Sequence, residues 1–248
     1  MDLQIRGKRA AVAAGTAGLG FGVAKALVTA GVEVVICGRD PDRLQRAVDE
    51  LGPGADGVVA DVGNASGATA FTEAATERLG GLDILITNAG GPPPGNFADT
   101  PLDAYPAALD LNLMSTVAMC KAAVPGMQAQ GWGRVVAITS ITVRQPIEYL
   151  LLSNTARAGA TGFLKTIALE VAPDGVTVNS VQPGFHATDR LAGLPEDASA
   201  AIIDDIPVGR MGDPDDLGRV VAFLCSEAAG FITGAAIPVD GGAYRGLQ

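Results

Sequence analysis

The stretch from Gly15 to Gly20 has the residue types of a phosphate-binding turn. It follows a short apolar run, leads into a segment with helical spacing, and contains five candidate cofactor-binding residues: Gly15, Thr16, Gly18, Leu19 and Gly20. Glycines allow a tight turn, and the first backbone N–H groups of a helix form a positive end that attracts phosphate. The spacing differs from Gly-x-Gly-x-x-Gly, and glycine clusters also occur in ordinary strand–helix connections. Other residues must therefore decide whether a dinucleotide binds here.

Arg39 and Asp40 follow the second apolar run, where a dinucleotide fold contacts the adenosine ribose. An acidic side chain at this point holds the free 2′-hydroxyl of NAD, whereas an arginine accommodates the 2′-phosphate of NADP. Arg39 therefore favours NADP(H) over NAD(H). Asp40 keeps NAD(H) open, and a solvated Arg39 at the start of the next helix is the alternative without a ligand.

Two more polar groups stand at the ends of predicted strands. Asp61 and Val62 close the third predicted strand, and Asn88, Ala89 and Gly90 follow the fourth. Ligands in open α/β sheets bind outside the carboxyl ends of the strands. Together with the glycine turn and Arg39, these residues predict one dinucleotide site assembled from several strand ends.

The elements that must position these residues alternate between strands and helices. Seven short apolar runs are the candidate strands: Ala10–Ala14, Val32–Cys37, Gly57–Asp61, Leu82–Thr87, Arg134–Thr139, Val176–Val181 and Ala236–Val239. The alternation predicts a doubly wound α/β fold, in which helices cover both faces of one parallel sheet. No linker rich in Pro, Gly and Ser divides the 248 residues, so we expect a single domain over residues 1–248.

Three helices and one loop have expected bounds. Leu19–Ala30 has an apolar stripe, and Gly31 follows where a helix C-terminal cap adopts a positive φ. Leu109–Gln130 and Asn154–Val171 are longer, and their apolar faces exceed what one sheet needs, which makes them candidates for a subunit interface. Phe185–Pro207 has little periodicity and is expected to be a mobile loop with a short helix.

The composition disfavours several classes of partner. The formal charge of −10 and the lack of a run of Lys or Arg predict neither a nucleic acid nor a membrane partner. The strand-like apolar runs are shorter than the roughly 20 residues that cross a bilayer, and no signal-peptide stretch is visible, so we expect a cytoplasmic protein. Cys37, Cys120 and Cys225 are widely separated, and His186 is the single histidine, so we expect buried thiols and no metal site.

Together these motifs resemble the short-chain dehydrogenase/reductase family over nearly the whole chain, most closely its 3-oxoacyl-(acyl-carrier-protein) reductase-like branch. The matching residues are the glycine turn, Asp61-Val62, Asn88-Ala89-Gly90, Asn112, Thr139-Ser140, Pro183-Gly184, Thr188 and Val239-Asp240-Gly241-Gly242. The resemblance implies a seven-stranded Rossmann sheet, a homo-oligomer that is commonly a tetramer, and hydride exchange with a small alcohol or carbonyl compound. It also implies that Pro183, Gly184 and Thr188 contact the cofactor.

Two parts of the chain depart from the family pattern. In the family's turn, Thr-Gly-x-x-x-Gly-x-Gly, the first two positions fall on Ala13 and Ala14. In its catalytic Tyr-x-x-x-Lys, the tyrosine position falls on Ser153 and the lysine position on Arg157. Arg157 keeps a positive charge that can bind the cofactor ribose, but a guanidinium does not release a proton near neutrality.

Ser140 and Asn112 are retained, and the resemblance implies that they polarise a carbonyl and sustain a water relay. The sequence leaves the proton donor open. Ser153 offers an aliphatic hydroxyl, which is a poor acid without strong activation. Tyr149 would share a helix face with Ser153 if that helix began one turn earlier. His186 titrates in a suitable pH range, although a lone histidine in a loop is also typical of a surface.

These observations leave two leading hypotheses for function. The first is an NADP(H)-dependent oxidoreductase that interconverts a carbonyl and an alcohol with an atypical catalytic set. The second is a catalytically degenerate NADP(H)-binding protein, a cofactor sensor or assembly subunit. An S-adenosylmethionine-dependent methyltransferase also uses a glycine turn, but Arg39 and Asn88-Ala89-Gly90 disfavour it. We expect the segments Gly91–Thr100, Ile141–Leu152 and Phe185–Pro207 to line the substrate site, and they match no specific binding motif.

Overall fold

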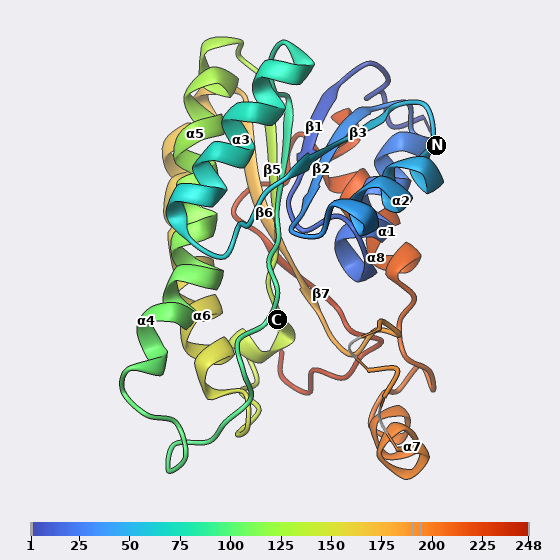
Figure 1. Ribbon diagram of the computed structural model, residues 1–248, viewed down its shortest axis with the longest axis vertical. Helices are drawn as coiled ribbons and strands as arrows, with labels where there is room; N and C mark the ends of the chain where they lie inside the picture. Colours follow the sequence, from blue (N-terminus) through green and yellow to red (C-terminus); the bar gives the residue numbers. More distant parts are fainter. Residues whose placement is uncertain (1, 190, 194, 248) are drawn as a thin grey trace.

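A computed structural model of the chain describes residues 2–189, 191–193 and 195–247. Its centre is a seven-stranded sheet in the order β3-β2-β1-β4-β5-β6-β7, and every neighbouring pair is parallel. The strands are β1 (Arg9–Val12), β2 (Glu33–Gly38), β3 (Ala55–Val59), β4 (Ile84–Thr87), β5 (Gly133–Ile138), β6 (Val176–Pro183) and β7 (Ala236–Val239). The predicted doubly wound α/β fold is confirmed, because helices lie on both sides of this sheet (Figure 1).

Helices α1, α2 and α8 cover one face of the sheet, and α3, α5 and α6 cover the other (Figure 1). The helices are α1 (Gly18–Thr29), α2 (Pro41–Leu51), α3 (Ala65–Leu79), α4 (Ala104–Leu109), α5 (Ser115–Ala129), α6 (Leu151–Val171), α7 (Glu196–Asp204) and α8 (Pro214–Leu224). A π-helical turn, η1 (Asp110–Met114), joins α4 to α5. Short 3₁₀ turns form η2 (Ile141–Val143), η3 (Ala172–Asp174) and η4 (Glu227–Ala229).

Successive residues of the central strands supply two separate cores. Ala10 and Val12 of β1 pack beneath α1 and α8, whereas Ala11 packs on the side of α3 and α5. Successive side chains of a strand point to opposite faces, so a strand covered on both faces must be apolar at every position. This is why the central strands were visible in the sequence as unbroken apolar runs.

The third predicted strand is present but its predicted bounds, Gly57–Asp61, are wrong, since β3 runs from Ala55 to Val59. β3 stands at the edge of the sheet and pairs with β2, so most of its residues are half-exposed and form no clear apolar run. Asp56 and Gly57 are poor strand formers, and pairing with β2 holds them in the strand. Asp61 and Val62 therefore lie in the loop after β3 rather than at its end.

Two predicted helices begin earlier than expected. The helix expected over Leu109–Gln130 begins at Ala104 and runs without a break through α4, η1 and α5. Pro125 lies inside α5, which continues to Ala129, because tertiary packing outweighs the loss of one backbone hydrogen bond. The helix expected over Asn154–Val171 begins at Leu151. The short helix expected within Phe185–Pro207 is α7, although residues 190 and 194 of that segment lie outside the described residues.

The helical stretch Ala104–Ala129 is long and apolar enough to cross a membrane by length and composition alone. This stretch is longer than any of the strand-like apolar runs on which the expectation of no membrane partner rested. Within the protein, 44% of its most apolar window is buried, and Met119 and Cys120 of α5 lie in the core shared with α3. The core helix of a globular protein can meet the same length and composition criteria as a membrane-spanning helix. This stretch alone is therefore not evidence of a membrane span.

The predicted cap of α1 is confirmed. Gly31 has a φ of +84°, and its N–H donates to the Val28 carbonyl at 2.9 Å. The Val32 N–H donates to the Leu27 carbonyl at 3.1 Å. These two bonds form a Schellman motif, which satisfies carbonyls that the helix end would otherwise leave unpaired. The chain therefore enters β2 from a defined point.

The three cysteines are buried free thiols, as predicted. Burial raises the pKa of Cys37, Cys120 and Cys225 to about 12 in each case. A thiol with so high a pKa is not a nucleophile near neutrality. All three side chains therefore serve packing.

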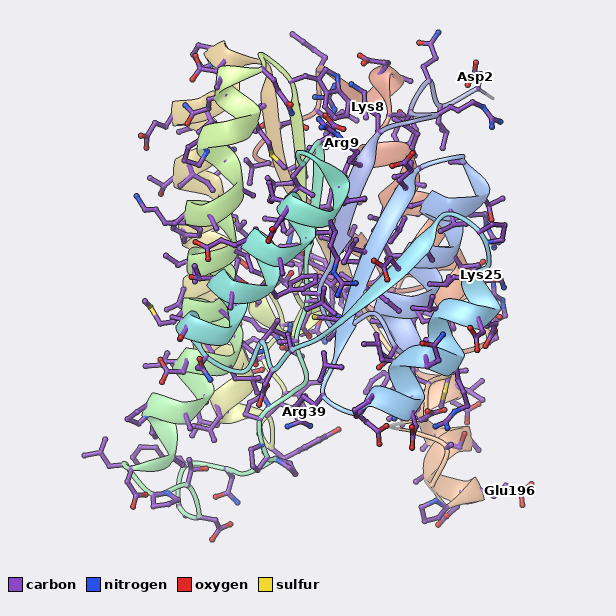
Figure 2. All side chains as sticks on the ribbon, turned by 45° about the horizontal axis from the view of Figure 1, so that its top comes forward. Asp2, Lys8, Arg9, Lys25, Arg39 and Glu196 are labelled. Atoms are coloured by element: carbon purple, nitrogen blue, oxygen red, sulfur yellow. The ribbon has the colours of Figure 1, made fainter. Side chains whose placement is uncertain are left out.

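An ion pair joins the amino ends of β1 and β4, at the end of the molecule opposite Arg39 (Figure 2). Arg9 donates from Nε to Asp83 Oδ2 at 2.8 Å and from Nη2 to Oδ1 at 3.0 Å. The Asp83 side chain is only 8% exposed. Burial alone would raise the pKa of Asp83, but the hydrogen bonds from Arg9 outweigh burial and hold the pKa below its ordinary value.

We expect Asp83→Asn to lower the free energy of unfolding at pH 7 by about 1.5–3 kcal/mol, the usual contribution of a hydrogen bond to a charged group. Because the folded-state pKa is depressed, the native protein has this stability above about pH 4 and loses it as the pH falls through the folded-state pKa. Urea unfolding between pH 7 and pH 3 measures the free energy of unfolding of the native protein and of the variant. The difference between these two free energies should become smaller at acid pH.

The matched control is Asp56→Asn, which removes an exposed pair with Arg78. Exposed pairs contribute less than about 1 kcal/mol, so this variant should change unfolding little. A loss for Asp83→Asn that stays constant from pH 7 to pH 3 would contradict the assignment to its charge.

Candidate functional site

A cavity of about 570 Å³ opens at the carboxyl edge of the sheet. It brings together many of the residues singled out in the sequence: Gly18, Leu19, Asn88, Ala89, Gly90, Ser140, Tyr149, Ser153, Arg157, Pro183, Gly184 and Thr188. Asn112, Gly15, Thr16, Gly20, Arg39, Asp61 and Val62 lie outside its lining. The cavity thus collects the ends of β4, β5 and β6 and the start of α1 in one place.

The start of α1 presents backbone donors to this cavity. The N-cap position is Ala17, which provides no side-chain hydrogen bond, and Gly18 and Leu19 line the cavity. The first N–H groups of a helix have no partner within the helix, so uncapped ones are available to an anion. Gly18 has a φ of +54°, a conformation that glycine adopts without strain.

Gly15 and Gly20 act by close packing rather than by lining the cavity. A Cβ at Gly20 would overlap the Ala14 carbonyl oxygen and come within 2.8 Å of Asn88 Nδ2. A Cβ at Gly15 would lie 2.8 Å from Ile36 Cγ2. Thr16 packs where a Cβ at Gly38 would stand. These residues press the turn against the ends of β1, β2 and β4.

Ala14 holds a backbone conformation that favours glycine, with a φ of +47°. Its carbonyl oxygen accepts a hydrogen bond from Asn88 Nδ2 at 3.3 Å, which ties the end of β1 to the end of β4. A left-handed conformation costs a residue with a side chain roughly 1–2 kcal/mol. The turn therefore keeps a backbone conformation that favours glycine at a position occupied by alanine.

We expect Ala14→Gly to raise the free energy of unfolding by about 0.5–1 kcal/mol, since relief of strain exceeds the extra entropy of glycine in the unfolded chain. Urea unfolding measures the change. The control is Ala13→Gly, because Ala13 is fully buried and is not among the residues with positive φ. That variant should be destabilised, and equal destabilisation of both variants would contradict the strain at Ala14.

Arg39 and Asp61 lie beside the cavity near the ends of β2 and β3. The Arg39 side chain is 79% exposed and extends away from the ribbon (Figure 2), with Nη1 4.0 Å from Asp61 Oδ2. Asp40 caps α2 by accepting a hydrogen bond from the Arg43 N–H at 2.9 Å. Asp61 also accepts from the Gly63 N–H at 2.9 Å. Val62 is buried beneath them.

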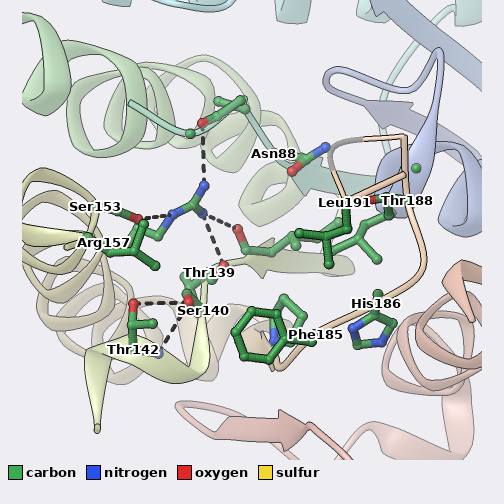
Figure 3. Close-up of a pocket in the computed structure, with 18 of the residues that line it drawn as sticks. Asn88, Thr139, Ser140, Thr142, Ser153, Arg157, Phe185, His186, Thr188 and Leu191 are labelled. Carbon is green, nitrogen blue, oxygen red and sulfur yellow. Dashed lines mark hydrogen bonds between the residues drawn. The ribbon is translucent and has the colours of Figure 1, made fainter. Parts of the chain in front are cut away.

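Arg157 is held by the backbone at the floor of the cavity (Figure 3). Its Nη1 donates to the carbonyls of Ile138 and Thr139 at 3.0 and 3.1 Å, and Nη2 donates to the Gly90 carbonyl at 3.4 Å. Its Nε donates to Ser153 Oγ at 3.3 Å. The guanidinium thus joins α6 to the loops after β4 and β5, and a flexible ammonium would form fewer of these bonds.

Ser140 is oriented by Thr142, which the sequence analysis did not single out. Thr142 donates to Ser140 Oγ from its N–H at 3.2 Å and from its Oγ1 at 3.0 Å (Figure 3). Thr142 is buried, whereas Ser140 is half-buried and lines the cavity. Because Ser140 Oγ accepts both of these bonds, its own hydrogen is left to donate elsewhere. A Ser-x-Thr spacing was the only sequence signal for this pair.

Asn112 sits in the π-helical turn η1, behind the cavity. It is 5% exposed, and its Nδ2 donates to the Gly90 carbonyl at 2.8 Å. Its Oδ1 is buried with no hydrogen-bond partner among the described residues. A single π-helical turn inside an α-helix is frequent at functional sites.

Tyr149 does not share a helix face with Ser153 inside α6, because α6 begins at Leu151 and Tyr149 lies in the turn before it. Tyr149 nevertheless lines the cavity, with 54% of its surface exposed. An isolated bridge between Gly95 and Leu150 fixes the backbone here, and the Gly95 N–H donates to the Tyr149 carbonyl at 2.7 Å. Pairing between distant loops, rather than helix periodicity, brings this phenol to the cavity.

His186 is 4% exposed and lines the cavity, so its description as a surface residue is wrong. Its ring lies against Gly212, where a Cβ would come within 2.6 Å, and its Nδ1 is 3.1 Å from the Gly184 carbonyl. Burial lowers the pKa of His186 below its ordinary value, and the contact with Gly184 offsets only part of this. The imidazole is therefore neutral at pH 7.

Arg43 and Asp189 also line the cavity and were not found from the sequence. Arg43 Nη2 donates to Asp189 Oδ2 at 2.9 Å, which links the start of α2 to the loop after β6. The two residues are 146 positions apart, and no local pattern marks either one. Each group is largely exposed, so the pair adds little stability.

The fold and cavity define a Rossmann-type α/β protein with a ligand site at the carboxyl edge of its sheet. The family model described as enoyl-(acyl carrier protein) reductase matches residues 13–244. The chain is 34% identical to a 3-oxoacyl-[acyl-carrier-protein] reductase of Aquifex aeolicus (strain VF5), over 98% of this chain and 100% of the relative. It is 34% identical to human dehydrogenase/reductase SDR family member 4, over 95% and 87% of the two chains.

Solved structures agree with these relatives. L-sorbose reductase from Gluconobacter frateurii, complexed with NADPH and L-sorbose, has a TM-score of 0.93 at 30% identity, over 100% of both chains. A 7α-hydroxysteroid dehydrogenase complexed with NADH has a TM-score of 0.92 at 29% identity, over 100% of this chain and 98% of the other. The chain belongs to the short-chain dehydrogenase/reductase family of oxidoreductases.

Proposed function

We propose that this protein is an NADP(H)-dependent oxidoreductase that interconverts a carbonyl compound and an alcohol with an atypical catalytic set. The observation that carries the proposal is the cavity, which contains both the uncapped start of α1 and the oriented Ser140 hydroxyl. An anion site and a carbonyl-binding hydroxyl in one cavity are what such a reaction requires. The relatives are named reductases and dehydrogenases, which supports the same reaction class.

The residues present fit a dinucleotide. The backbone N–H groups of Gly18 and Leu19 would hold its pyrophosphate, and Thr188, whose methyl group lies close to Gly18, would close over it. A Cβ at Gly90 would meet nothing within 4 Å, so this part of the cavity wall is open to a flat ring. Pro183 and Gly184 line the same region. When bound, the nicotinamide supplies or accepts a hydride.

Arg39 supports NADP(H) as the cofactor. Its guanidinium is exposed at the end of β2, where the 2′-phosphate of the adenosine ribose would lie. Asp40, the residue that favoured NAD(H), already caps α2 through the Arg43 N–H. The nearby Asp61 would hold Arg39 in position. Similar solved structures contain NADPH in one case and NADH in another. The proposed preference for NADP(H) over NAD(H) therefore rests on Arg39.

In the proposed reaction Ser140 donates a hydrogen bond to the carbonyl oxygen, and Thr142 keeps the Ser140 hydroxyl turned toward the cavity. Tyr149 supplies the proton, because a phenol is a stronger acid than the aliphatic hydroxyl of Ser153. Arg157 keeps its charge near the cofactor ribose and positions Ser153. The buried Asn112 Oδ1 would bind a water behind the site.

NADPH oxidation by the purified protein tests the function. We expect absorbance at 340 nm to fall above background with at least one member of a panel of ketones, aldehydes and quinones. NADPH at about 100 times its dissociation constant should stabilise the protein by about 2.7 kcal/mol in thermal melts. Arg39→Ala should abolish the preference for NADPH over NADH, whereas Arg46→Ala, an exposed change on α2, should retain it.

A catalytically degenerate NADP(H)-binding protein is the second candidate. The observation that favours it is Arg157, whose guanidinium braces three backbone carbonyls at the position of the family's catalytic lysine. If NADPH stabilises the protein but no compound of the carbonyl panel causes NADPH oxidation, the protein is a cofactor-binding protein without this activity. The oxidoreductase proposal is then rejected. Equal stabilisation by NADH and NADPH would reject the role of Arg39.

Tyr149→Phe tests the proton donor. We expect kcat to fall by about 10²-fold or more, the usual loss when one general acid is removed, with the dissociation constant for NADPH unchanged. Tyr105→Phe is the control, because Tyr105 of α4 does not line the cavity. A larger loss for Ser153→Ala than for Tyr149→Phe would assign the proton to Ser153 instead.

Two features of organisation complete the proposal. The described part of residues 185–207 covers the substrate end of a single domain, since Phe185 and Leu191 line the cavity. The helical stretch Ala104–Ala129 and α6 form the interface of a homo-oligomer, where Met114 and Leu169 are exposed apolar side chains. Sedimentation at several protein concentrations measures the assembly.

A further inference from the structure

The end of the cavity around Ser140 has an apolar lining. The side chains of Ile141, Ile147, Leu150, Phe185 and Leu191 line it together with Pro94. Figure 3 shows Phe185 and Leu191 on the side of Ser140 that is away from Ser153. Four hydroxyl groups also line the cavity, those of Ser140, Thr142, Tyr149 and Ser153. Such a lining favours a ligand that buries apolar surface and needs one or two hydrogen bonds.

The charges that line the cavity are already engaged. Among the described residues that line the cavity, the side chains of Arg, Lys, Asp or Glu type are those of Arg43, Arg157 and Asp189. Arg43 and Asp189 pair with each other at 2.9 Å. Arg157 bonds backbone carbonyls and Ser153, as described above. An anionic substrate would therefore compete with protein acceptors for hydrogen bonds from these side chains.

The segments around the substrate end are acidic. The chain segments 91–100, 141–152 and 185–207, which contribute the apolar lining, contain two arginines against seven acidic residues, Asp99, Glu148, Asp189, Glu196, Asp197, Asp204 and Asp205. One of the arginines, Arg144, donates from Nη2 to the Ala236 carbonyl at 2.7 Å. An excess of one sign of charge in the segments near a cavity lowers the local concentration of ligands of the same sign. The part of the site that would hold the adenosine of the cofactor has a different charge, because Arg39 and the positive end of α1 lie there.

We propose that the substrate is an uncharged, mainly apolar carbonyl compound, and that coenzyme A or carrier-protein thioesters are disfavoured. This inference rests on the proposed function. The carbonyl carbon gains a hydride from NADPH and its oxygen gains a proton, which yields the neutral alcohol and NADP⁺. The phosphates of a thioester carrier would lie near the acidic segments, whereas a neutral substrate would bury apolar surface against the apolar lining.

A matched pair of substrates tests the proposal. Ethyl 3-oxobutanoate and acetoacetyl-coenzyme A present the same 3-oxo group, and the group attached to it is small and neutral in the ester but large and anionic in the thioester. We expect kcat/KM for the ester to exceed that for the thioester by at least about tenfold at low ionic strength, with the gap narrowing as salt screens the acidic segments. A thioester preferred at any ionic strength would overturn the proposal.

A charge change identifies the cause. Glu148→Lys places a cation next to the cavity at an exposed position, and it should raise kcat/KM for the thioester several-fold while leaving the ester unchanged. Glu73→Lys on α3 makes the same change in net charge away from the cavity and should alter neither substrate. A gain with Glu73→Lys equal to that with Glu148→Lys would overturn the local electrostatic argument.

Binding separates this inference from the proposed function. Calorimetry with the NADP⁺-loaded protein should give a dissociation constant at least about tenfold lower for the ester than for acetoacetyl-coenzyme A. If neither compound is reduced but the ester binds more tightly, the oxidoreductase proposal fails and the assignment of ligand class stands. If the thioester binds more tightly, the assignment of ligand class fails whether or not either compound is reduced.

Discussion

The site depends on how closely the start of α1 approaches the ends of β1 and β4. Glycine at position 20 permits this approach, because a Cβ there would overlap the Ala14 carbonyl oxygen and crowd Asn88. The carbonyl of Ala14 and the amide of Asn88 are themselves hydrogen-bonded, so one glycine brings a helix end and two strand ends together. Without that contact, the backbone donors of α1 would stand apart from the cavity and from Ser140.

Much of the fold was predictable because the central strands are buried on both faces. A parallel sheet covered by helices requires apolar residues at successive positions, and β1, β4, β5 and β6 follow this rule. β3 did not, because an edge strand is half-exposed and pairing with β2 overrides poor local propensities at Asp56 and Gly57. The location of the cavity was predictable for a related reason, since parallel strands all end at one edge.

The fine structure of the site was less predictable, because it rests on contacts between distant segments. Tyr149 reaches the cavity because the adjacent Leu150 forms a bridge with Gly95, rather than through helix periodicity. Arg157 was expected to bind a ribose, and the structure adds its bonds to backbone carbonyls, which carry no side-chain signature in a sequence. His186 lies in a loop, and its burial follows from the close contact with Gly212. Residue type alone predicted which groups have chemistry, but tertiary pairing decides where they point.

The carbonyl oxygen of Gly90 accepts hydrogen bonds from Asn112 and from Arg157. One donor belongs to the π-helical turn before α5 and the other to α6, so a single peptide group links two long helices to the loop after β4. Turning this peptide would break both bonds at once, at a cost of about 0.5–1.5 kcal/mol for the neutral donor and more for the charged one. The loop is therefore preorganised, and a ligand that settles against it would spend little of its binding energy on rearranging the protein.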